Sequence, residues 1–471
     1  MFITLTLIII GNVRCQQQLM NTKTAAGSIS SPSTAKPIKT TKNIRRVTFP
    51  DITKLYSIGK SVQGRELWVI SVTSHNSSTD PDTDLKPNVK YVANMHANEA
   101  IGREMVLHLL AHLVNHSNKS TNVKNLLRHT RIHLMPSMNP DGFEKAIEGK
   151  CQSGPGRHNA ANVDLNRNFP DRFFKSNVAE QPETAAIRKW IHEKQFALSL
   201  NIHGGALVVN YPFDGSQNHS ESHIEKSPDH DTFVHLALAL AKRHPKLRQK
   251  VQCIQEEWFE NGITNGNAWY PIRGSMQDYN YINGGCMELT FEISCCKYPP
   301  KSELVSFWND NKIPLLTFLT EVHKGVKGRI YDSNTEHRIA NANITILGRE
   351  MTFHSDSNGR FWRILLPGDY VLVVKANGYQ TLQKQFTVSE HKITVINVYM
   401  APIVRHSRSH NLQQQKYLIK KGQNYDELLM GQSAALTMVK NGTNSQQRIQ
   451  LQIVPLIMLV WAILTIVNKN C

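Results

Sequence analysis

Two segments of the sequence place possible metal ligands directly after apolar runs of strand length. His96 and Glu99 follow the run Val89–Met95, and His203 follows the run Ala197–Ile202. A His and a Glu three residues apart, where a strand gives way to a helix, can direct an imidazole nitrogen and a carboxylate oxygen at one cation. Two glycines after the second His allow the close backbone approach that a crowded site requires. Each of these histidines taken alone is more easily explained as structural. Together, two His and one Glu leave the fourth zinc position open, which is typical of hydrolytic zinc sites.

A hydrolytic zinc site also needs a base, and Glu292 is the candidate. This carboxylate lies in the otherwise apolar run Met287–Ile293, where a charge is costly unless it is paired or functional. Burial would raise its pKa toward the range in which a carboxylate takes and returns protons near neutral pH. The alternative role is that of a buried salt-bridge partner, and the residue alone does not decide between the two.

A third stretch of the sequence contains cationic and amide side chains that could bind a substrate. It contains Arg157 and the segment 164–170, which reads Asp-Leu-Asn-Arg-Asn-Phe-Pro. A guanidinium group matches the planar geometry of a carboxylate, so it suits the recognition of a peptide's C-terminus. Such a site needs one anchor for the terminal carboxylate and another donor for an oxyanion. The alternative is a surface turn with incidental arginines.

The elements that must position these residues alternate over 46–324. The segment 103–116 repeats apolar residues at helical spacing, and 231–244 begins with Asp231, a residue suited to an N-cap. Strand-length apolar runs separate such stretches, at Leu67–Val72, Val89–Met95, Ile132–Met135, Ala197–Ile202 and Met287–Ile293. This alternation predicts one α/β domain with a mostly buried sheet.

The character of the sequence changes after Gly325. Residues 325–401 contain short strand-like runs separated by turn signals such as Pro367-Gly368 and Asn377-Gly378, with no helical pattern. The expected strands are Val326–Tyr331, Ala342–Leu347, Gly359–Ile364, Asp369–Lys375 and Ile393–Tyr399. This pattern predicts a small β-sandwich. The Gln- and Lys-rich segment 402–450 is expected to be a stalk.

Both ends of the chain have the composition of processed segments. Residues 1–15 are typical of a signal peptide, and the Ser-, Thr- and Lys-rich segment 16–45 of a flexible lead-in. The apolar end 451–471, preceded by a polar spacer and small residues near Asn441, is typical of the signal for a lipid anchor. A retained membrane span is the alternative. We therefore expect a glycoprotein at the extracellular face of the plasma membrane, or secreted, with acceptor sequons at Asn76, Asn115, Asn118, Asn218, Asn343 and Asn441.

The net charge of +17 raises the possibility of nucleic-acid binding. Part of that charge lies in 36–46 and 405–421, and no aromatic-interleaved basic groove accompanies it, so we expect no nucleic-acid partner. Attraction to acidic surface polymers or lipid headgroups is the milder expectation. Five cysteines lie outside the two processed ends and permit two disulfides and one free thiol: Cys151, Cys253, Cys286, Cys295 and Cys296.

Several motifs, taken in order, closely resemble the regulatory (N/E-type) zinc metallocarboxypeptidases. The tail makes the chain most similar to the M-type members. The resemblance covers roughly residues 47–401 and implies a mixed central sheet flanked by helices, followed by a transthyretin-like sandwich. The motifs are His96-x-x-Glu99, Asn139-Pro140-Asp141-Gly142, Asp164–Asp171, His203-Gly204-Gly205 and the run Gly274–Pro299.

The resemblance implies one Zn²⁺ per chain, held by His96, Glu99 and His203. In this family Asp164 would accept a hydrogen bond from the other ring nitrogen of the first His. Glu292 would be the general base and acid.

The same resemblance assigns the substrate-binding residues. Arg157 would polarise the scissile carbonyl and stabilise the oxyanion. Asn166 and Arg167 would bind the terminal carboxylate, and the Tyr270 hydroxyl would close over the substrate.

A specificity pocket and two disulfides also follow from the resemblance. Asp214 and Gln277 would receive a Lys or Arg side chain, because members with basic specificity place an acid and a Gln there. The implied disulfides join Cys151 to Cys296 and Cys253 to Cys295, which leaves Cys286 free.

Two features depart from the family pattern. Ala97 replaces the usual Gly after the first zinc His, so one methyl group comes close to the metal site. The family's helix before 49–52 is replaced by Ser-, Thr- and Lys-rich sequence, and no implied site residue lies there.

The sequence therefore predicts a monomeric zinc exopeptidase that removes C-terminal Lys or Arg from peptides and proteins. The alternative is a catalytically silent relative that acts as a surface binding or adhesion protein. Relatives of that kind lose a ligand or the base, and this chain retains all of them.

Overall fold

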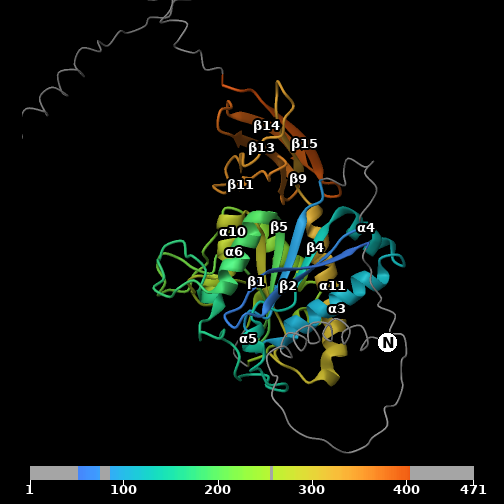
Figure 1. Ribbon diagram of the computed structural model, residues 1–471, viewed down its shortest axis with the longest axis vertical. Helices are drawn as coiled ribbons and strands as arrows, with labels where there is room; N and C mark the ends of the chain where they lie inside the picture. The colour runs from blue at the N-terminus through green and yellow to red at the C-terminus, as the bar shows by residue number, and fades with distance from the viewer. Residues whose placement is uncertain (1–50, 75–84, 255–257, 404–471) are drawn as a thin grey trace, which may run out of the picture. The chain divides into compact units, whose positions relative to one another are not determined.

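The apolar runs of the first predicted domain assemble into one eight-stranded mixed sheet in the computed structural model (Figure 1). The structure describes residues 51–74, 85–254 and 258–403. The predicted signal peptide, lead-in and C-terminal tail, and almost all of the predicted stalk, lie outside these residues. The strands are β1 (Thr53–Lys60), β2 (Glu66–Val72), β3 (Asn88–Ala93), β4 (Arg131–Met135), β5 (Phe196–His203), β6 (Leu207–Tyr211), β7 (Ile263–Asn265) and β8 (Met287–Ile293).

The strand order is β1-β2-β4-β3-β5-β8-β6-β7. The central strands β4, β3, β5 and β8 run parallel to one another, whereas β1, β2 and β6 make antiparallel pairs. Every residue of β3, β5 and β8 is buried, as expected for parallel strands covered on both faces. Since parallel strands end at the same edge, the residues that follow β3 and β5 lie beside the end of β8.

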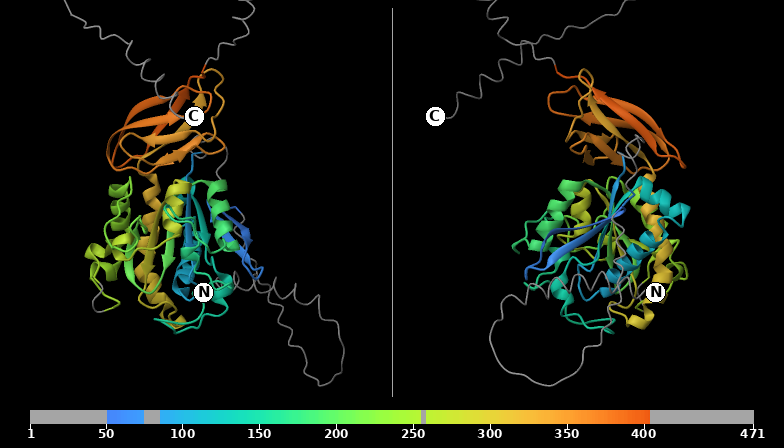
Figure 2. Two further views of the ribbon diagram at one scale, coloured as in Figure 1. Left: turned by 90° about the vertical axis from the view of Figure 1, so that its left-hand side faces the viewer. Right: turned by 45° about the vertical axis from the view of Figure 1, so that its right-hand side comes forward.

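Helices cover both faces of this sheet (Figures 1 and 2). On one face α3, α7 and α11 pack side by side, and on the other face lie α6 and α10. Within the described residues, no helix combines the length and apolarity that a membrane crossing needs. The helices are α3 (Ala100–His116), α4 (Thr121–His129), α5 (Pro140–Phe143), α6 (Pro182–Lys194), α7 (His230–Ala241), α8 (Pro245–Arg248), α9 (Gly266–Trp269), α10 (Met276–Gly284) and α11 (Leu304–Thr320), with short 3₁₀ turns at Leu165–Arg167, Glu260–Gly262, Lys301–Glu303 and Glu321–His323.

The predicted start of the second helix was wrong by two residues. Asp229, not Asp231, is the N-cap of α7, and the helix ends at Ala241. Asp231 lies in the first turn and forms an ion pair with Arg349, at 2.7 Å. The strands β1, β6 and β7 were not predicted from the sequence; β1 and β7 are the edge strands, and β6 lies next to β7.

The second part of the chain is a sandwich of a four-stranded and a three-stranded sheet, and this confirms the predicted fold class. The four-stranded sheet has the order β11-β10-β13-β14 and the other has β12-β9-β15. Two of these strands, β11 and β14, were not predicted, because their alternating residues are largely polar. The strands are β9 (Val326–Asp332), β10 (Asn343–Ile346), β11 (Thr352–His354), β12 (Arg360–Arg363), β13 (Gly368–Lys375), β14 (Leu382–Val388) and β15 (Thr394–Met400).

Two disulfides tie the segment after β8 to distant loops. Cys151 pairs with Cys296 and Cys253 pairs with Cys295, so the adjacent cysteines reach in different directions. Cys286 is a buried free thiol. The pairing implied by the family resemblance is confirmed.

A buried ionic cluster joins the sandwich to the α/β part. The Asp229 carboxylate accepts hydrogen bonds from Arg363 of β12 at 2.6 Å, from Arg349 at 2.9 Å and from the Tyr281 hydroxyl of α10 at 2.6 Å. Burial opposes the charge of Asp229, but the Arg363 guanidinium outweighs it and holds the pKa of this carboxyl below its usual range. The sandwich is thereby connected to α10.

A second buried cluster crosses the three central strands in one row. Lys90 of β3 stands opposite Ser199 of β5, which stands opposite Glu288 of β8. The Lys90 ammonium donates to Ser199 Oγ at 2.6 Å and to Glu288 Oε2 at 2.7 Å, and Asn280 of α10 donates to the same carboxylate oxygen. Both charged side chains are fully buried. A one-residue slip of any of these strands would break the row, so the row specifies the register.

Removing one partner of this row should be costly, because it leaves a buried charge without its counter-ion. We expect Lys90→Met to lower the free energy of unfolding by about 3–5 kcal/mol. In the double variant Lys90→Met/Glu288→Leu, we expect most of that loss to be recovered. The measurement is denaturant unfolding, with Lys189→Met in the exposed Lys189–Glu193 pair as the control, expected to cost under about 1 kcal/mol. A Lys90→Met loss no larger than that of the control would contradict a role of the row in register.

Candidate metal centre and active site

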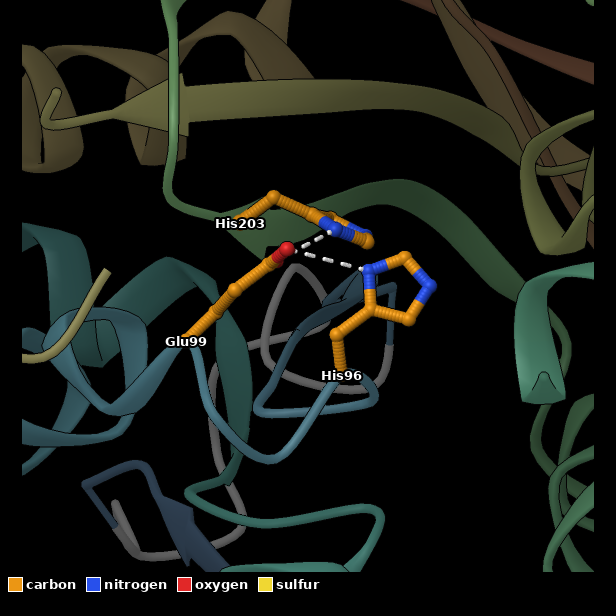
Figure 3. A group of neighbouring side chains, drawn as sticks. All are labelled: His96, Glu99 and His203. Carbon is orange, nitrogen blue, oxygen red and sulfur yellow. Dashed lines mark hydrogen bonds and ion pairs between the residues drawn. The ribbon is translucent and has the colours of Figure 1, made fainter. Parts of the chain in front are cut away.

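His96, Glu99 and His203 converge at the carboxyl edge of the central strands (Figure 3). The first lies in the turn after β3, the second is the N-cap of α3, and the third is the last residue of β5. One ligand atom from each lies within 4.8 Å of the other two, and all three side chains are buried. Within the described residues, no other group of three or more His, Cys, Asp or Glu side chains meets in this way.

The donor atoms fit a zinc ion. His96 Nδ1 lies 3.3 Å from Glu99 Oε1, and His203 Nδ1 lies 2.9 Å from Glu99 Oε2. The outward-facing nitrogen of the first ring, His96 Nε2, lies 3.0 Å from Asp164 Oδ1, which is the arrangement that fixes the ring of a metal-binding His. Two imidazole nitrogens and a carboxylate are the ligand set of a zinc site with an open position.

Two glycines after His203 allow the close approach that the site needs. A Cβ added at Gly204 would lie 2.7 Å from Ile101 Cγ2, and one added at Gly205 would lie 2.7 Å from Lys297 Cε. The backbone at Gly205 has a φ of +126°. The methyl group of Ala97 is accommodated, since this residue is fully buried and its amide donates to the Gly156 carbonyl at 3.1 Å.

Cationic groups surround the Glu99 carboxylate. Burial opposes its charge, but the imidazoles of His96 and His203 outweigh burial and hold the pKa of Glu99 well below its usual range. The Lys297 ammonium lies 2.8 Å from Glu99 Oε1, and Arg157 lies 3.7 Å from the same atom. The carboxylate therefore stays ionised, which is the form that binds a metal.

Glu292 lies beside these ligands on β8. It stands opposite His203 in the parallel register, and its Oε1 is 4.0 Å from His203 Nδ1. Its Oε2 is buried and finds no hydrogen-bond partner among the residues that the structure describes. Burial raises the pKa of Glu292 to about 7, and the neighbouring Glu99 carboxylate adds to the rise. A carboxyl group in this state can exchange a proton with a reacting group near neutral pH.

Arg157 is held at the metal centre by Asp164. Its Nε and Nη2 donate to Asp164 Oδ2 at 3.1 Å and 2.8 Å, and its Nη1 lies 3.3 Å from His96 Nδ1. The guanidinium is partly exposed. Its charge is thus available to a group bound next to the metal ligands.

A hollow of about 370 Å³ opens from the metal ligands. Asn166, Arg167 and Tyr270 line it together with His96, His203 and Glu292. The first two both lie in the 3₁₀ turn Leu165–Arg167, where Asn166 Oδ1 accepts from the Met276 amide at 3.0 Å.

Asp214 is a buried carboxylate that lines the same hollow. Its Oδ1 accepts from Gln277 Nε2 at 3.0 Å and from Asn210 Nδ2 at 2.9 Å. Burial raises the pKa of Asp214. Gly266 is required beside it, because an added Cβ would lie 1.9 Å from Asp214 Oδ1. The two amides fix one carboxylate oxygen and orient the side chain.

Three of these residues were missed by sequence reasoning. Asn210 lies four residues before Asp214, so its nearness in the sequence offered a signal. Lys297 lies in the run Gly274–Pro299, but its contact with Glu99 depends on the folded chain. The same is true of the contact between Gly266 and Asp214, and the sequence gave no signal for Gly266. All the residues assigned by the sequence lie at this one site, and their catalytic and binding roles remain predictions.

A mixed sheet with such ligands at its carboxyl edge and a buried carboxylate beside them defines a metal-dependent hydrolase. Comparison with known proteins gives the family. The family model described as zinc carboxypeptidase matches residues 41–313, and the one described as carboxypeptidase regulatory-like domain matches 325–401.

Curated relatives agree with these matches. Carboxypeptidase M of Mus musculus is 45% identical over 345 residues, which span 72% of this chain and 77% of that protein. The Homo sapiens carboxypeptidase N catalytic chain is 40% identical and aligns with 74% of this chain and 81% of its own length. Homo sapiens carboxypeptidase D is 41% identical over 78% of this chain but only 26% of its own length.

The chain belongs to the zinc carboxypeptidase family. The predicted family, enzyme class and zinc cofactor are therefore confirmed: this is a metallocarboxypeptidase, and its substrates are peptides.

Zinc affinity should separate the residues that hold the metal from those that act beside it. We expect Asp164→Asn to weaken zinc binding by about 10- to 100-fold, since it removes an outer partner of a ligand, and His203→Gln to weaken it more. The matched control is Glu292→Gln, which should keep zinc near one per chain. Zinc titration against a competing chelator measures all three. Equal zinc loss in the control and in His203→Gln would contradict the ligand assignment.

Proposed function

We propose that the chain removes C-terminal Lys or Arg from peptides and proteins. The observation that supports this specificity is the buried Asp214 carboxylate in the wall of the hollow that opens from the metal ligands. A Lys or Arg side chain reaching this carboxylate would form a desolvated ion pair, and a neutral side chain would leave the carboxylate unpaired. The Gln277 and Asn210 amides hold one carboxylate oxygen and so fix the orientation of the group that would meet the incoming cation.

The terminal carboxylate of the substrate would be bound by Asn166 and Arg167. A guanidinium and an amide at neighbouring positions of one turn offer several donors to a planar carboxylate. Tyr270 is half-exposed at the rim of the hollow, which suits a side chain that closes over a bound peptide. This binding mode excludes internal peptide bonds and makes the enzyme an exopeptidase.

The chemical step assigns separate tasks to Glu292 and Arg157. Zinc, when bound, supplies Lewis-acid activation of water and of the scissile carbonyl. Glu292 would accept a proton from the attacking water and return it to the leaving amine, which its pKa of about 7 permits. Arg157 would stabilise the negative charge that develops on the carbonyl oxygen, a contribution of about 3–4 kcal/mol.

We also propose that the enzyme is a monomer at the extracellular face of the plasma membrane, attached by a lipid anchor. The two disulfides support an oxidising compartment, and the apolar segment 451–471 supports the anchor.

Peptides that differ only in their last residue test the specificity. For Asp214→Asn, we expect kcat/KM on peptides ending in Arg or Lys to fall by about 30-fold or more, because one side of a buried ion pair is lost. Hydrolysis of a peptide ending in Leu serves as the internal control and should not fall. Retained preference for Arg and Lys in this variant would contradict the pocket assignment.

The proton transfer has its own test. Glu292→Gln should lower kcat by at least about 100-fold while zinc remains bound. Near-normal turnover by the zinc-loaded variant would overturn the role of Glu292.

Release from cells tests the anchor. A phospholipase that cleaves glycosylphosphatidylinositol should release the active enzyme into the medium. Enzyme that stays with the membrane after this treatment would instead support a retained membrane span.

A further inference from the structure

One face of helix α3 carries histidines at successive turns. His108, His112 and His116 are spaced four residues apart and are partly exposed, and residues at this spacing are neighbours on a helix surface. The rings of His112 and His116 are stacked, with centroids 4.1 Å apart. His108 instead stacks on Trp308 of α11, with centroids 5.6 Å apart. The last two histidines thus form a pair, and His112 in addition lies 6.0 Å from the Trp308 ring, centroid to centroid.

Each of the two rings has a nitrogen that is open to a ligand. His116 Nδ1 donates to the His112 carbonyl oxygen at 2.9 Å, which leaves the lone pair on Nε2. Within the described part of the chain, no hydrogen bond occupies the ring of His112. Burial lowers the pKa of His112 to about 4, and the Lys312 charge adds to the effect, so this imidazole is neutral at physiological pH. Neutral imidazoles are the form that binds metals.

The pair is well separated from the zinc centre. Glu99 is the N-cap of α3 and His116 is its last residue, and a helix of 17 residues is about 25 Å long. The carboxyl end of a helix carries a partial negative charge, which favours a cation there. The positive charge of Lys312 on α11 instead disfavours a cation at this place.

We propose that His112 and His116 form a second metal site, which binds a divalent transition-metal ion such as Ni²⁺, Cu²⁺ or Zn²⁺. Two histidines four residues apart on one helix face can bind one ion, as in helical zinc motifs, and imidazole suits these three metals. The χ2 torsion of His is broad, so rotation of the stacked rings can direct both nitrogens at the ion. Water completes the coordination, because the two rings supply only two ligands.

The test is calorimetric titration of the zinc-loaded full-length protein with Ni²⁺. We expect one Ni²⁺ to bind per chain while the zinc content, measured in the same sample, stays at one. His112→Gln and His116→Gln should each weaken Ni²⁺ binding by about 100-fold, because the second binding step is then no longer intramolecular. His108→Gln, on the same helix face, is the matched control and should leave the affinity unchanged.

Further variants test whether other residues, near the pair in space or in the sequence, contribute to Ni²⁺ binding. Lys312→Gln should tighten Ni²⁺ binding about two- to fivefold by removing a repulsive charge. His406 and His410 share the spacing but lie outside the described residues, and their double substitution by Gln should change nothing. Asn115→Gln removes the glycan acceptor next to the site and should leave binding intact. The proposal is overturned if no Ni²⁺ binds to the zinc-loaded protein, or if the affinity is the same in His112→Gln and His116→Gln as in the wild type.

Discussion

The parallel register of β3, β5 and β8 is the constraint on which the site depends. The zinc ligands leave the ends of two of these strands, and Glu292 lies on the third, opposite His203. A slip of one residue would turn every side chain of a strand to the other face of the sheet. The buried row of Lys90, Ser199 and Glu288 opposes such a slip, since its charges are satisfied only in the observed register. The chemistry at the sheet edge therefore depends on an ionic contact in the middle of the sheet.

The sandwich contributes to the same α/β framework. Arg363 reaches Asp229, which accepts from Tyr281, and Tyr281 lies one turn beyond Gln277 on α10. Helix α10, which bears Gln277 of the pocket, is thus held by contacts from the α/β part and from the sandwich. A buried cluster of this kind is weak evidence of added stability, but it connects the two parts through specific contacts.

Much of the site could be predicted because metal chemistry demands particular residue types at strand ends. His96, Glu99 and His203 follow apolar runs whose period indicates strands, and the fold class follows from the alternation of such runs with helical patterns. Glu292 could be identified as unusual because a charge within an apolar run is costly. Its role could not be decided from the residue alone, since Lys90 and Glu288 show that buried charges in this sheet also serve structure.

The remaining features depend on contacts between distant segments. Lys297 meets Glu99 only through the fold, and Gly266 is required only because the Asp214 carboxylate lies against it. The strands β11 and β14 alternate mostly polar residues, so local hydrophobicity gave no signal for them. Asp231 resembled an N-cap in sequence, but Asp229 takes that position and Asp231 pairs with Arg349 of the sandwich. Local patterns locate residues along the chain, and tertiary packing decides which of them meet.

The most direct measurement is the location of zinc in crystals of the purified protein by anomalous scattering at the zinc edge. We predict one peak within about 2.0–2.2 Å of His96 Nδ1, His203 Nδ1 and a carboxylate oxygen of Glu99. The absence of a peak at these three side chains in crystals of an active preparation would contradict this assignment of the zinc ligands.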